Sequence, residues 1–355
     1  MITNPTRQRT LRGHLPSRPI PRVATSGEHQ ARLAARLTAR DRWLAHMLHE
    51  HAVLTSGQIA RLAWPSIRAA NLRLHQLYRW RVIDRFQPFV TVGTAPMHYI
   101  LDVAGATALA AEHGLTVADL RYRHDQAIAH AHSLRLAHTV GVNDVLTTLA
   151  AAGHPNAAGR LVAWWSEARC ARHYGDLVRP DTYARWHHHQ PPGRPVEVEW
   201  FLEYDLGTET LHRLAAKLDG YQRLAASTGI TTPVLFWLPT STREAHARRV
   251  LAAALAGLDQ PRLVPVATTA ADHHTGADPA GARWLPIPTP ANTTGSTATG
   301  ARTGGRVRLA DLAHAWPHLP PPPPPTAGTA GPAGGGGLPA PVPTPPPAAA
   351  YPIRR

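Results

Sequence analysis

Cysteine and lysine are almost absent from this chain of 355 residues. Cys170 is the only cysteine, so the chain cannot form an internal disulfide, and we expect the protein to work in the reducing cytoplasm. Lys217 is the only lysine among 37 basic residues, and all the others are arginine. Arginine carries a planar, permanent charge, whereas lysine carries a compact charge whose pKa responds to burial. The single lysine therefore indicates either a specific chemical role or chance.

Long apolar runs are absent as well. No stretch approaches the roughly 20 apolar residues that a membrane-spanning helix requires, so we expect no membrane-embedded segment. Residues 1–27 contain arginines and no acidic residue, but they lack the apolar centre of a signal peptide. We interpret them as a disordered basic arm.

The positive charge is concentrated in the first third of the chain. The net charge is +14, and residues 1–101 hold 15 arginines against four acidic residues, which gives this segment +11. Such a concentration favours a polyanionic partner, because phosphate contacts release bound counterions. A membrane surface also attracts basic arms, but the folded module that follows favours double-stranded DNA.

Three helices are predicted in the basic region. Apolar residues at helical spacing predict the first helix over residues 28–51. Thr55 and Gln58 form a capping-box pattern that starts a short second helix. Ser66 can cap a third helix, which continues to about residue 80. The apolar positions of the third helix fall on one face: Ile67, Ala70, Leu74 and Leu77.

The other face of the third helix is polar, and two strands follow it. The strands flank a turn at residues 93–96. The polar side chains have the chemistry that base edges and phosphates require, with Asn71 at the margin of the face and Arg85 on the first strand. The predicted DNA-binding residues are Arg68, Asn71, His75, Gln76, Arg79 and Arg85.

Three helices and a hairpin predict a winged helix-turn-helix domain over residues 28–121. Winged helices also serve as protein–protein modules, and a basic helix face is often merely solvated. The local charge of +11 favours DNA binding over both alternatives.

Residues 122–290 alternate helical and strand patterns, which predicts a second, α/β domain. The order helix, three strands, helix, strand is typical of a mixed sheet with helices on its faces, so the whole chain is predicted to be α+β. Helices are expected at 124–151, 208–226 and 242–258. Strands are expected at 161–166, 177–183, 196–205, 233–239 and 262–268.

Acidic residues collect at the ends of two of these strands. Asp181 ends one strand, and Glu203 and Asp205 lie on one face of the next. Three carboxylates brought together in this way could bind Mg²⁺, which would activate a water molecule against a phosphodiester. Lys217 lies on the polar stripe of the following helix and can face the carboxylates. The predicted metal ligands are Asp181, Glu203 and Asp205, and the predicted catalytic residues are these three with Lys217.

These motifs resemble two related groups of proteins. Asp181 after a proline, the acidic pair on a strand and Lys217 on a helix resemble the PD-(D/E)xK nuclease fold in the form whose lysine has moved to the helix. Residues 49–86, 96–114 and 202–221 together resemble the replication-relaxation proteins of actinobacterial plasmids and mobile elements. This resemblance implies a DNA-associated role in plasmid replication or maintenance, with plasmid replication or transfer proteins as partners.

One departure from the nuclease motif leaves two functions open. Asp205 stands where the usual motif has lysine, so either Lys217 replaces it from the helix, or the site binds metal or DNA without cutting. In the first case the protein is a Mg²⁺-dependent endonuclease or nickase. In the second it regulates replication, with the second domain as a clamp or dimer surface.

Histidine is abundant, with 23 residues, but its spacing favours no zinc site. There is no Cys-x-x-Cys or His-Glu-x-x-His pattern, and His187–His189 are expected in a proline-rich loop. Residues 291–355 form a Pro/Gly/Ala-rich tail that we expect to be disordered apart from one marginal helix at 306–319. The tail could be a tether for a partner or only a solvated extension.

Overall fold

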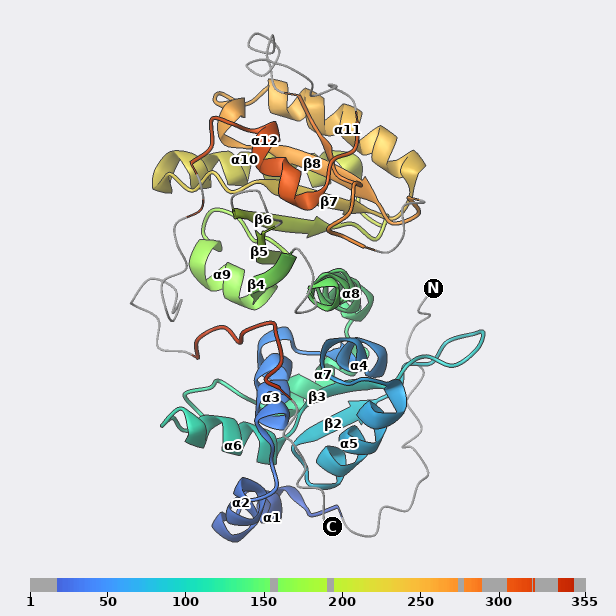
Figure 1. Ribbon diagram of the computed structural model, residues 1–355, viewed down its shortest axis with the longest axis vertical. Coiled ribbons are helices and arrows are strands. Elements are labelled where there is room, and N and C mark those ends of the chain that lie inside the picture. The colour runs from blue at the N-terminus through green and yellow to red at the C-terminus, as the bar shows by residue number, and fades with distance from the viewer. Residues whose placement is uncertain are drawn as a thin grey trace. The chain divides into compact units, whose positions relative to one another are not determined.

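The computed structural model describes residues 18–153, 159–189, 195–273, 278–288, 305–320, 322 and 338–347. The chain forms two compact units (Figure 1). Unit 1 comprises Met1–Thr147 and Ala327–Arg355, and unit 2 comprises Thr148–Thr326. The first unit therefore extends beyond the predicted boundary at residue 121.

Unit 1 combines helices with a small antiparallel sheet. The sheet has the strand order β1-β3-β2, and β2 and β3 are the predicted hairpin. Its helices are α1 (Pro21–Ala24), α2 (Gly27–Ala34), α3 (Ala39–His51), α4 (Ser56–Ala63), α5 (Ile67–Arg79), α6 (Val103–Glu112), α7 (His124–Ala129), η1 (His130–His132) and most of α8 (Leu136–Ala152), whose residues after Thr147 belong to unit 2. Its strands are β1 (Leu54–Thr55), β2 (Ile83–Phe86) and β3 (His98–Leu101).

Side-chain caps decide where the helices of unit 1 begin. The predicted capping box of Thr55 and Gln58 starts α4, and Ser66 caps α5 by accepting a hydrogen bond from the backbone N–H of Ala69. The single helix expected over 28–51 is wrong, because the chain forms α2 and α3 instead. Thr38 and Asp41 make a second capping box that starts α3, so the helical pattern is interrupted before it.

The helix expected over 124–151 is also interrupted. The chain forms α7, a single turn η1 and then α8. Ala131 and Leu136 are buried in a cluster with Val53, Phe86 and Ile100, which belong to the helical and sheet part of unit 1. The hydrophobic core of unit 1 therefore depends on residues beyond 121.

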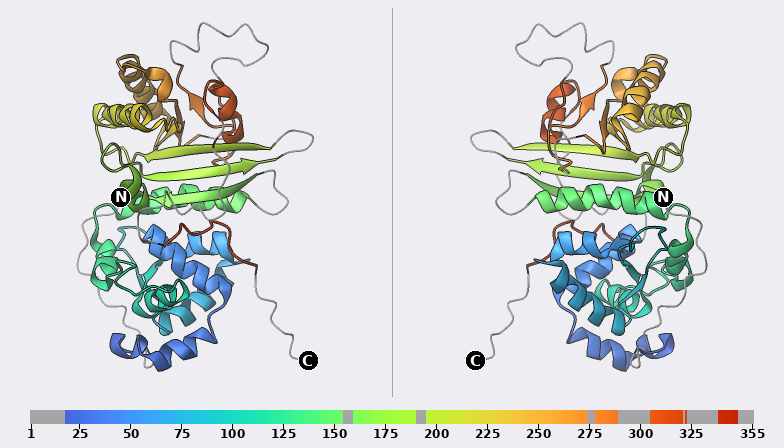
Figure 2. Two further views of the ribbon diagram at one scale, coloured as in Figure 1. Left: turned by 90° about the vertical axis from the view of Figure 1, so that its left-hand side faces the viewer. Right: turned by 90° about the vertical axis from the view of Figure 1, so that its right-hand side faces the viewer.

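Unit 2 is built on a six-stranded mixed sheet in the order β4-β5-β6-β7-β8-β9 (Figure 2). The β4, β5 and β6 strands are antiparallel, β6, β7 and β8 are parallel, and β9 is antiparallel to β8. The strands are β4 (Gly159–Ser166), β5 (Thr182–His188), β6 (Val196–Tyr204), β7 (Val234–Leu238), β8 (Val266–Ala270) and β9 (Leu285–Pro286). The helices are α9 (Glu167–Tyr174), α10 (Leu211–Thr228), α11 (Ser241–Ala256), η2 (Pro261–Leu263), η4 (Leu309–Asp311) and α12 (Leu312–Ala315).

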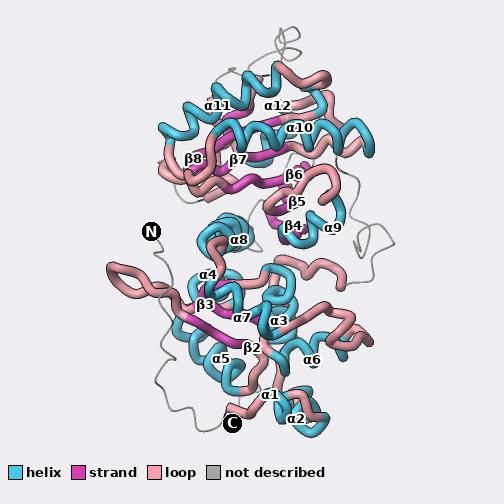
Figure 3. The backbone as a smooth tube through the Cα atoms, turned by 180° about the vertical axis from the view of Figure 1, so that it is seen from behind, coloured by secondary structure: helices cyan, strands magenta, loops and turns pink. Residues whose placement is uncertain are grey.

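The middle of unit 2 differs from the expected strand pattern. Helix α9 follows β4 directly (Figure 3), and the predicted strand at 177–183 instead starts at Thr182. Ser166 caps α9 by accepting from the backbone N–H of Arg169, a local signal that the strand pattern obscured. His187 and His188 consequently lie on β5, and their predicted placement in a loop is wrong.

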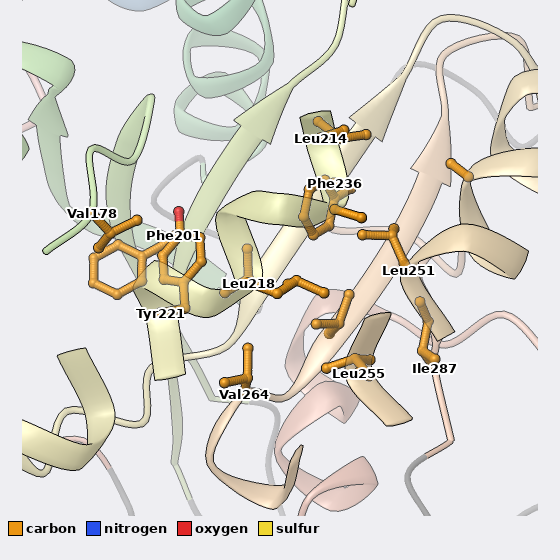
Figure 4. Packing of buried hydrophobic residues seen from close by; sticks show 14 of the residues in the cluster. Val178, Phe201, Leu214, Leu218, Tyr221, Phe236, Leu251, Leu255, Val264 and Ile287 are labelled. Carbon is orange, nitrogen blue, oxygen red and sulfur yellow. The ribbon is translucent and has the colours of Figure 1, made fainter. Parts of the chain in front are cut away.

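The core of unit 2 lies between the sheet and the helices α10 and α11. Phe201 and Phe236 of the sheet pack with Leu218 and Tyr221 of α10 and Leu251 of α11 (Figure 4). Both helices connect parallel strands, so they cover the same face of the sheet. Within the described residues, no helix combines the length and apolar character that crossing a membrane requires.

Parts of both terminal regions pack against the folded units. In the N-terminal arm, Arg18 pairs with Asp84 and Asp102, and residues 21–24 form α1. In the C-terminal tail, Leu312 and Trp316 are buried in unit 2, where η4 and α12 contact β6. Residues 338–347 belong to unit 1 and are hydrogen-bonded to side chains of α3. Residues 18–24 and 338–347 are therefore packed where disorder was expected, and the marginal helix expected at 306–319 is formed as η4 and α12. Residues 1–17 and most of the rest of the tail lie outside the described residues.

Candidate functional site

The predicted polar face of α5 is exposed to solvent. Arg68, His75 and Gln76 are exposed, and so are Asn71 and Arg79. Ala70, Leu74 and Leu77 on the other face are fully buried, which fixes the rotation of the helix. Ile67, which was expected on the buried face, is 49% exposed because it occupies the first turn of α5. The helix therefore presents five polar side chains to solvent, with the exposed Leu72 among them.

Arg73 is a functional neighbour that the sequence analysis missed. Its guanidinium donates to Asp41 of α3 at 2.9 Å through Nε and at 2.5 Å through Nη2. Its Nη1 donates to Oε1 of Gln76 at 2.7 Å. Because Asp41 is buried, this pair ties α5 to α3 and orients Gln76 on the exposed face. The signal was the capping pattern of Thr38 and Asp41, which places a carboxylate beside α5.

Arg85 lies apart from the exposed set on α5. It belongs to β2 and is half-buried, and its guanidinium carbon lies 4.4 Å from the centre of the Tyr78 ring. Arg18 lies over the same ring at 4.1 Å. Such contacts between a cation and an aromatic ring stabilise the packing of the side chain. The structure thus places Arg85 in an internal stack, whereas the other five predicted residues share one exposed surface.

The loop between β2 and β3 has an apolar tip. Residues 87–97 contain no arginine, lysine, aspartate or glutamate. Phe89 is 59% exposed and Val92 is 88% exposed. Any electrostatic attraction of unit 1 for a polyanion therefore comes from parts of the unit other than this loop.

The acidic residues of unit 2 surround a fully buried carboxylate, Glu203. Lys217 of α10 donates to its Oε2 at 2.5 Å, and the Tyr221 hydroxyl donates to its Oε1. Gly220 lets α10 pack closely against the backbone at Leu177, because a Cβ at this position would lie 2.8 Å from the Leu177 carbonyl oxygen. The predicted approach of Lys217 to the strand carboxylates is therefore present.

Asp181 lies beside Glu203, just before the neighbouring strand β5 begins. It directly precedes β5, and the pairing of Thr182 with Leu202 puts it next to Glu203. Its Oδ2 accepts a hydrogen bond from the backbone N–H of Tyr204 at 2.8 Å. Both carboxylates are buried, and their mutual repulsion is part of the electrostatics of this site.

Asp205 has a different partner, Arg243, which the sequence analysis missed. The guanidinium Nε contacts Oδ2 of Asp205, and Nη2 donates to Oδ1 at 3.2 Å. The same Nη2 donates to the Glu209 carbonyl oxygen at 2.6 Å. Arg243 lies at the start of α11, which follows a strand parallel to β6, so the sheet topology brings the two residues together.

Burial controls the protonation of the cluster around Glu203. Burial and the neighbouring Asp181 raise the pKa of Glu203 to about 7, although Lys217 and Tyr221 act in the opposite direction. Burial lowers the pKa of Lys217, but the charges of Glu203 and Asp181 outweigh it and raise that pKa above its ordinary value. Burial and the charge of Glu203 raise the pKa of Tyr221, so its hydroxyl remains a donor.

The three predicted metal ligands do not converge on one point. Mg²⁺ requires several oxygen atoms at close and regular distances. Arg243 is hydrogen-bonded to Asp205, and Lys217 and Tyr221 are hydrogen-bonded to the two carboxylate oxygens of Glu203. In this arrangement Asp181, Glu203 and Asp205 form ion pairs and hydrogen bonds instead of an open ligand set, and they do not fit a bound Mg²⁺ without rearrangement.

A convergent group of potential ligands does occur in unit 1, within the part of the chain that the structure describes. It consists of Asp84, Asp102 and His124. However, Arg81 binds Asp102 through two contacts, and Arg18 lies 2.6 Å from Asp102 and 2.9 Å from Asp84. The two guanidinium groups balance the two carboxylates, so this group is an internal ion-pair network.

The remaining candidates from the sequence have structural contacts. Cys170 is fully buried in the core of unit 2. His187 on β5 lies 3.3 Å from Glu197 of β6.

A match to known proteins is found at the level of a family model. No curated protein and no solved structure matches this chain. A family model matches residues 46–235, a range that includes α5, Asp181, Glu203 and Lys217 but ends before Arg243. The matched range is more than half of the chain, and the model describes replication-relaxation proteins, so the chain belongs to the replication-relaxation family.

Proposed function

We propose that this protein binds double-stranded DNA in the replication or maintenance of a plasmid or mobile element, with α3, α4, α5 and the β2–β3 hairpin acting as a winged helix-turn-helix. The observation that carries the proposal is the exposed polar face of α5. Membership of the replication-relaxation family supports the replication context. The order of three helices and a hairpin supports the winged-helix assignment.

The side chains of α5 suit a helix that enters the major groove. Asn71 and Gln76 carry amides that can pair with adenine, and Arg68 and Arg79 can bind guanine or phosphate. The face is held rigidly, because Leu74 and Leu77 anchor the helix and Arg73 joins it to Asp41. A rigid helix presents its side chains with little loss of side-chain and backbone entropy on binding.

Not every arginine of the basic region is available to a ligand. Arg18, Arg73 and Arg81 are engaged by internal carboxylates. Arg68 and Arg79 are exposed on α5. The affinity for DNA should therefore depend on few arginines and not on the total charge of +11.

The test is binding of the full-length protein to a labelled duplex over a series of salt concentrations. We expect binding at low salt that weakens steeply as salt rises, because phosphate contacts release counterions. Full-length protein is preferable to a fragment of residues 1–121, which would lack Ala131 and Leu136 of the core. No binding at low salt would contradict the proposal.

A second candidate function is a Mg²⁺-dependent endonuclease or nickase. It is favoured by one observation, the contact of Lys217 on α10 with Glu203 on β6, which agrees with the nuclease resemblance. It requires Asp205 to exchange Arg243 for another partner. Incubation of supercoiled plasmid with the protein and Mg²⁺ or Mn²⁺ separates the two candidates, because the DNA-binding function alone predicts no relaxed or linear product.

A further inference from the structure

A stripe of three side chains on α3 contacts the proline-rich segment 338–347 of the same unit. Trp43 donates its indole N–H to the Val342 carbonyl oxygen at 2.7 Å. Arg40 donates to the Pro346 carbonyl oxygen at 3.3 Å through Nε and at 3.0 Å through Nη2. His46 lies three residues beyond Trp43, and its Nε2 is 2.9 Å from the Pro339 carbonyl oxygen. The stripe and the segment therefore run in opposite directions.

The three donors occupy one face of α3. Residues at spacings of three lie close together on a helix surface, so Arg40, Trp43 and His46 form a continuous line. Trp43 is 9% exposed, and the other two are half-buried. Burial and the neighbouring His113 lower the pKa of His46 to about 4, so its ring is neutral at pH 7. A neutral ring protonated on Nε2 can donate to Pro339.

The segment contributes backbone carbonyls and proline rings. Its sequence is LPAPVPTPPP, in which Pro341 and Pro343 are buried while Val342 is 63% exposed. Proline has no N–H, so such a segment cannot satisfy its carbonyls with regular secondary structure. An aromatic side chain with a donor is the usual partner of such segments, because it packs on the rings and binds a carbonyl.

We propose that Arg40, Trp43 and His46 form a binding site for proline-rich segments, and that residues 338–347 occupy this site in the same molecule. The site recognises backbone carbonyl groups and proline rings. It therefore accepts a separate peptide of the same sequence when residues 338–347 are displaced. This role is independent of DNA binding, because these residues lie on α3 while the DNA-binding face lies on α5.

The experiment uses full-length protein and a fluorescein-labelled peptide with the sequence of residues 338–347. In the variant Pro341→Glu/Pro343→Glu, two buried rings are replaced by charged side chains, which releases the segment from the site. The tethered segment of the wild type competes at an effective concentration on the order of millimolar. Fluorescence anisotropy should therefore show binding to the variant that is at least about tenfold tighter than to the wild type.

Two further variants control this measurement. Val342→Ala keeps the carbonyl and changes only an exposed side chain, so it should behave as the wild type does. Adding Arg40→Gln to the released variant removes both bonds to Pro346 and should weaken peptide binding several-fold, and adding Trp43→Phe should weaken it further. Circular dichroism of each variant verifies that unit 1 is folded.

Two results would overturn the proposal. Equal peptide binding by the wild type and by Pro341→Glu/Pro343→Glu would show that the segment does not occupy the site. Undiminished binding after Arg40→Gln, which does not depend on the stability of the Trp43 variant, would show that the peptide binds elsewhere.

Discussion

The polar face of α5 and the end of β6 use charge in opposite ways. On the polar face of α5 the side chains of Arg68 and Arg79 are exposed, and the apolar face beneath them holds the helix in place. At the end of β6 the carboxylates of Glu203 and Asp205 are buried, and each has a cationic partner from a different helix. Exposed charges contribute little to stability and remain available to a ligand, whereas a buried charge that loses its partner destabilises the fold.

This difference changes the interpretation of the single lysine. Lys217 has a specific role in the structure, because it is the cationic partner of the fully buried Glu203. A structural role accounts for its position without requiring a reaction. The comparison predicts that changes on α5 alter binding and that changes around β6 alter stability.

The largest effect is expected for Lys217→Ala at pH 8. Removing Lys217 leaves the buried Glu203 without its cation, so in the folded state its carboxyl either stays charged and unpaired or takes up a proton, and the free energy of unfolding should fall by about 3 kcal/mol. We place this value at the lower end of the usual range because the Lys217 side chain is 31% exposed. Urea unfolding measures the change. Arg213→Ala on the exposed face of the same helix is the matched control and should change stability little.

A loss below about 0.5 kcal/mol for Lys217→Ala would contradict this account, since it would equal an ordinary surface substitution. In that case Glu203 would have to exchange Lys217 for another partner. Cleavage of plasmid by the wild type and not by Lys217→Ala, with equal stability, would instead favour the nuclease function.

The next prediction concerns pH. The pKa of Glu203 is about 7 in the folded state, above the ordinary value of 4.5. The folded state therefore holds the Glu203 proton more tightly than the unfolded state does. The contribution of this proton to the free energy of unfolding is complete below pH 4.5 and is lost as pH rises through 7. Glu203→Gln cannot ionise, so the unfolding free energy of the wild type minus that of the variant should decrease between pH 4.5 and 8.

Urea titrations of both proteins across this range measure the difference. An increase with pH would show that Lys217 and Tyr221 outweigh burial and that the pKa of Glu203 is lowered. A flat difference would show that Glu203 has the same pKa in the folded and unfolded states.

On α5, Arg68→Ala/Arg79→Ala should weaken duplex binding by about tenfold or more at fixed salt. The slope of the logarithm of affinity against the logarithm of salt should become shallower by about two, because two phosphate contacts are lost. The unfolding midpoint should change little, since both side chains are exposed. Arg223→Ala/Arg249→Ala removes the same charge from exposed positions of unit 2 and is the matched control.

Equal loss of affinity in both double variants would show that net charge, and not the α5 surface, determines DNA binding. A large loss of stability in Arg68→Ala/Arg79→Ala would show that this face contributes to the fold. Either result would remove the contrast between the two regions.

Local signals predicted the elements that caps and periodicity determine. Thr55 and Ser66 start α4 and α5 as expected, and the buried and exposed faces of α5 follow from its spacing. The end of α2 and the start of α3 could also have been predicted, because Thr38 and Asp41 repeat the capping-box pattern of Thr55 and Gln58. The apolar periodicity across this boundary concealed it.

Contacts between distant segments could not be predicted in the same way. Arg243 is 38 positions from Asp205, and the hydrogen bond of Trp43 to Val342 spans 299 positions. Such pairs depend on which strands are neighbours and on where the tail returns to the chain. Lys217 was predictable because α10 immediately follows β6, so the helix must pack back across the strand that holds Glu203.

The smallest effect is expected for Asp311→Asn, and it tests whether burial or location explains the contrast. Arg308 and Asp311 form an ion pair in unit 2, as Lys217 and Glu203 do, but their side chains are 52% and 35% exposed. If burial decides the cost, the free energy of unfolding at pH 7 should fall by less than about 0.5 kcal/mol. Urea unfolding beside Lys217→Ala gives the comparison. A loss near that of Lys217→Ala would show that unit 2 depends on its ion pairs wherever they lie, and burial would then no longer explain the difference between the end of β6 and the face of α5.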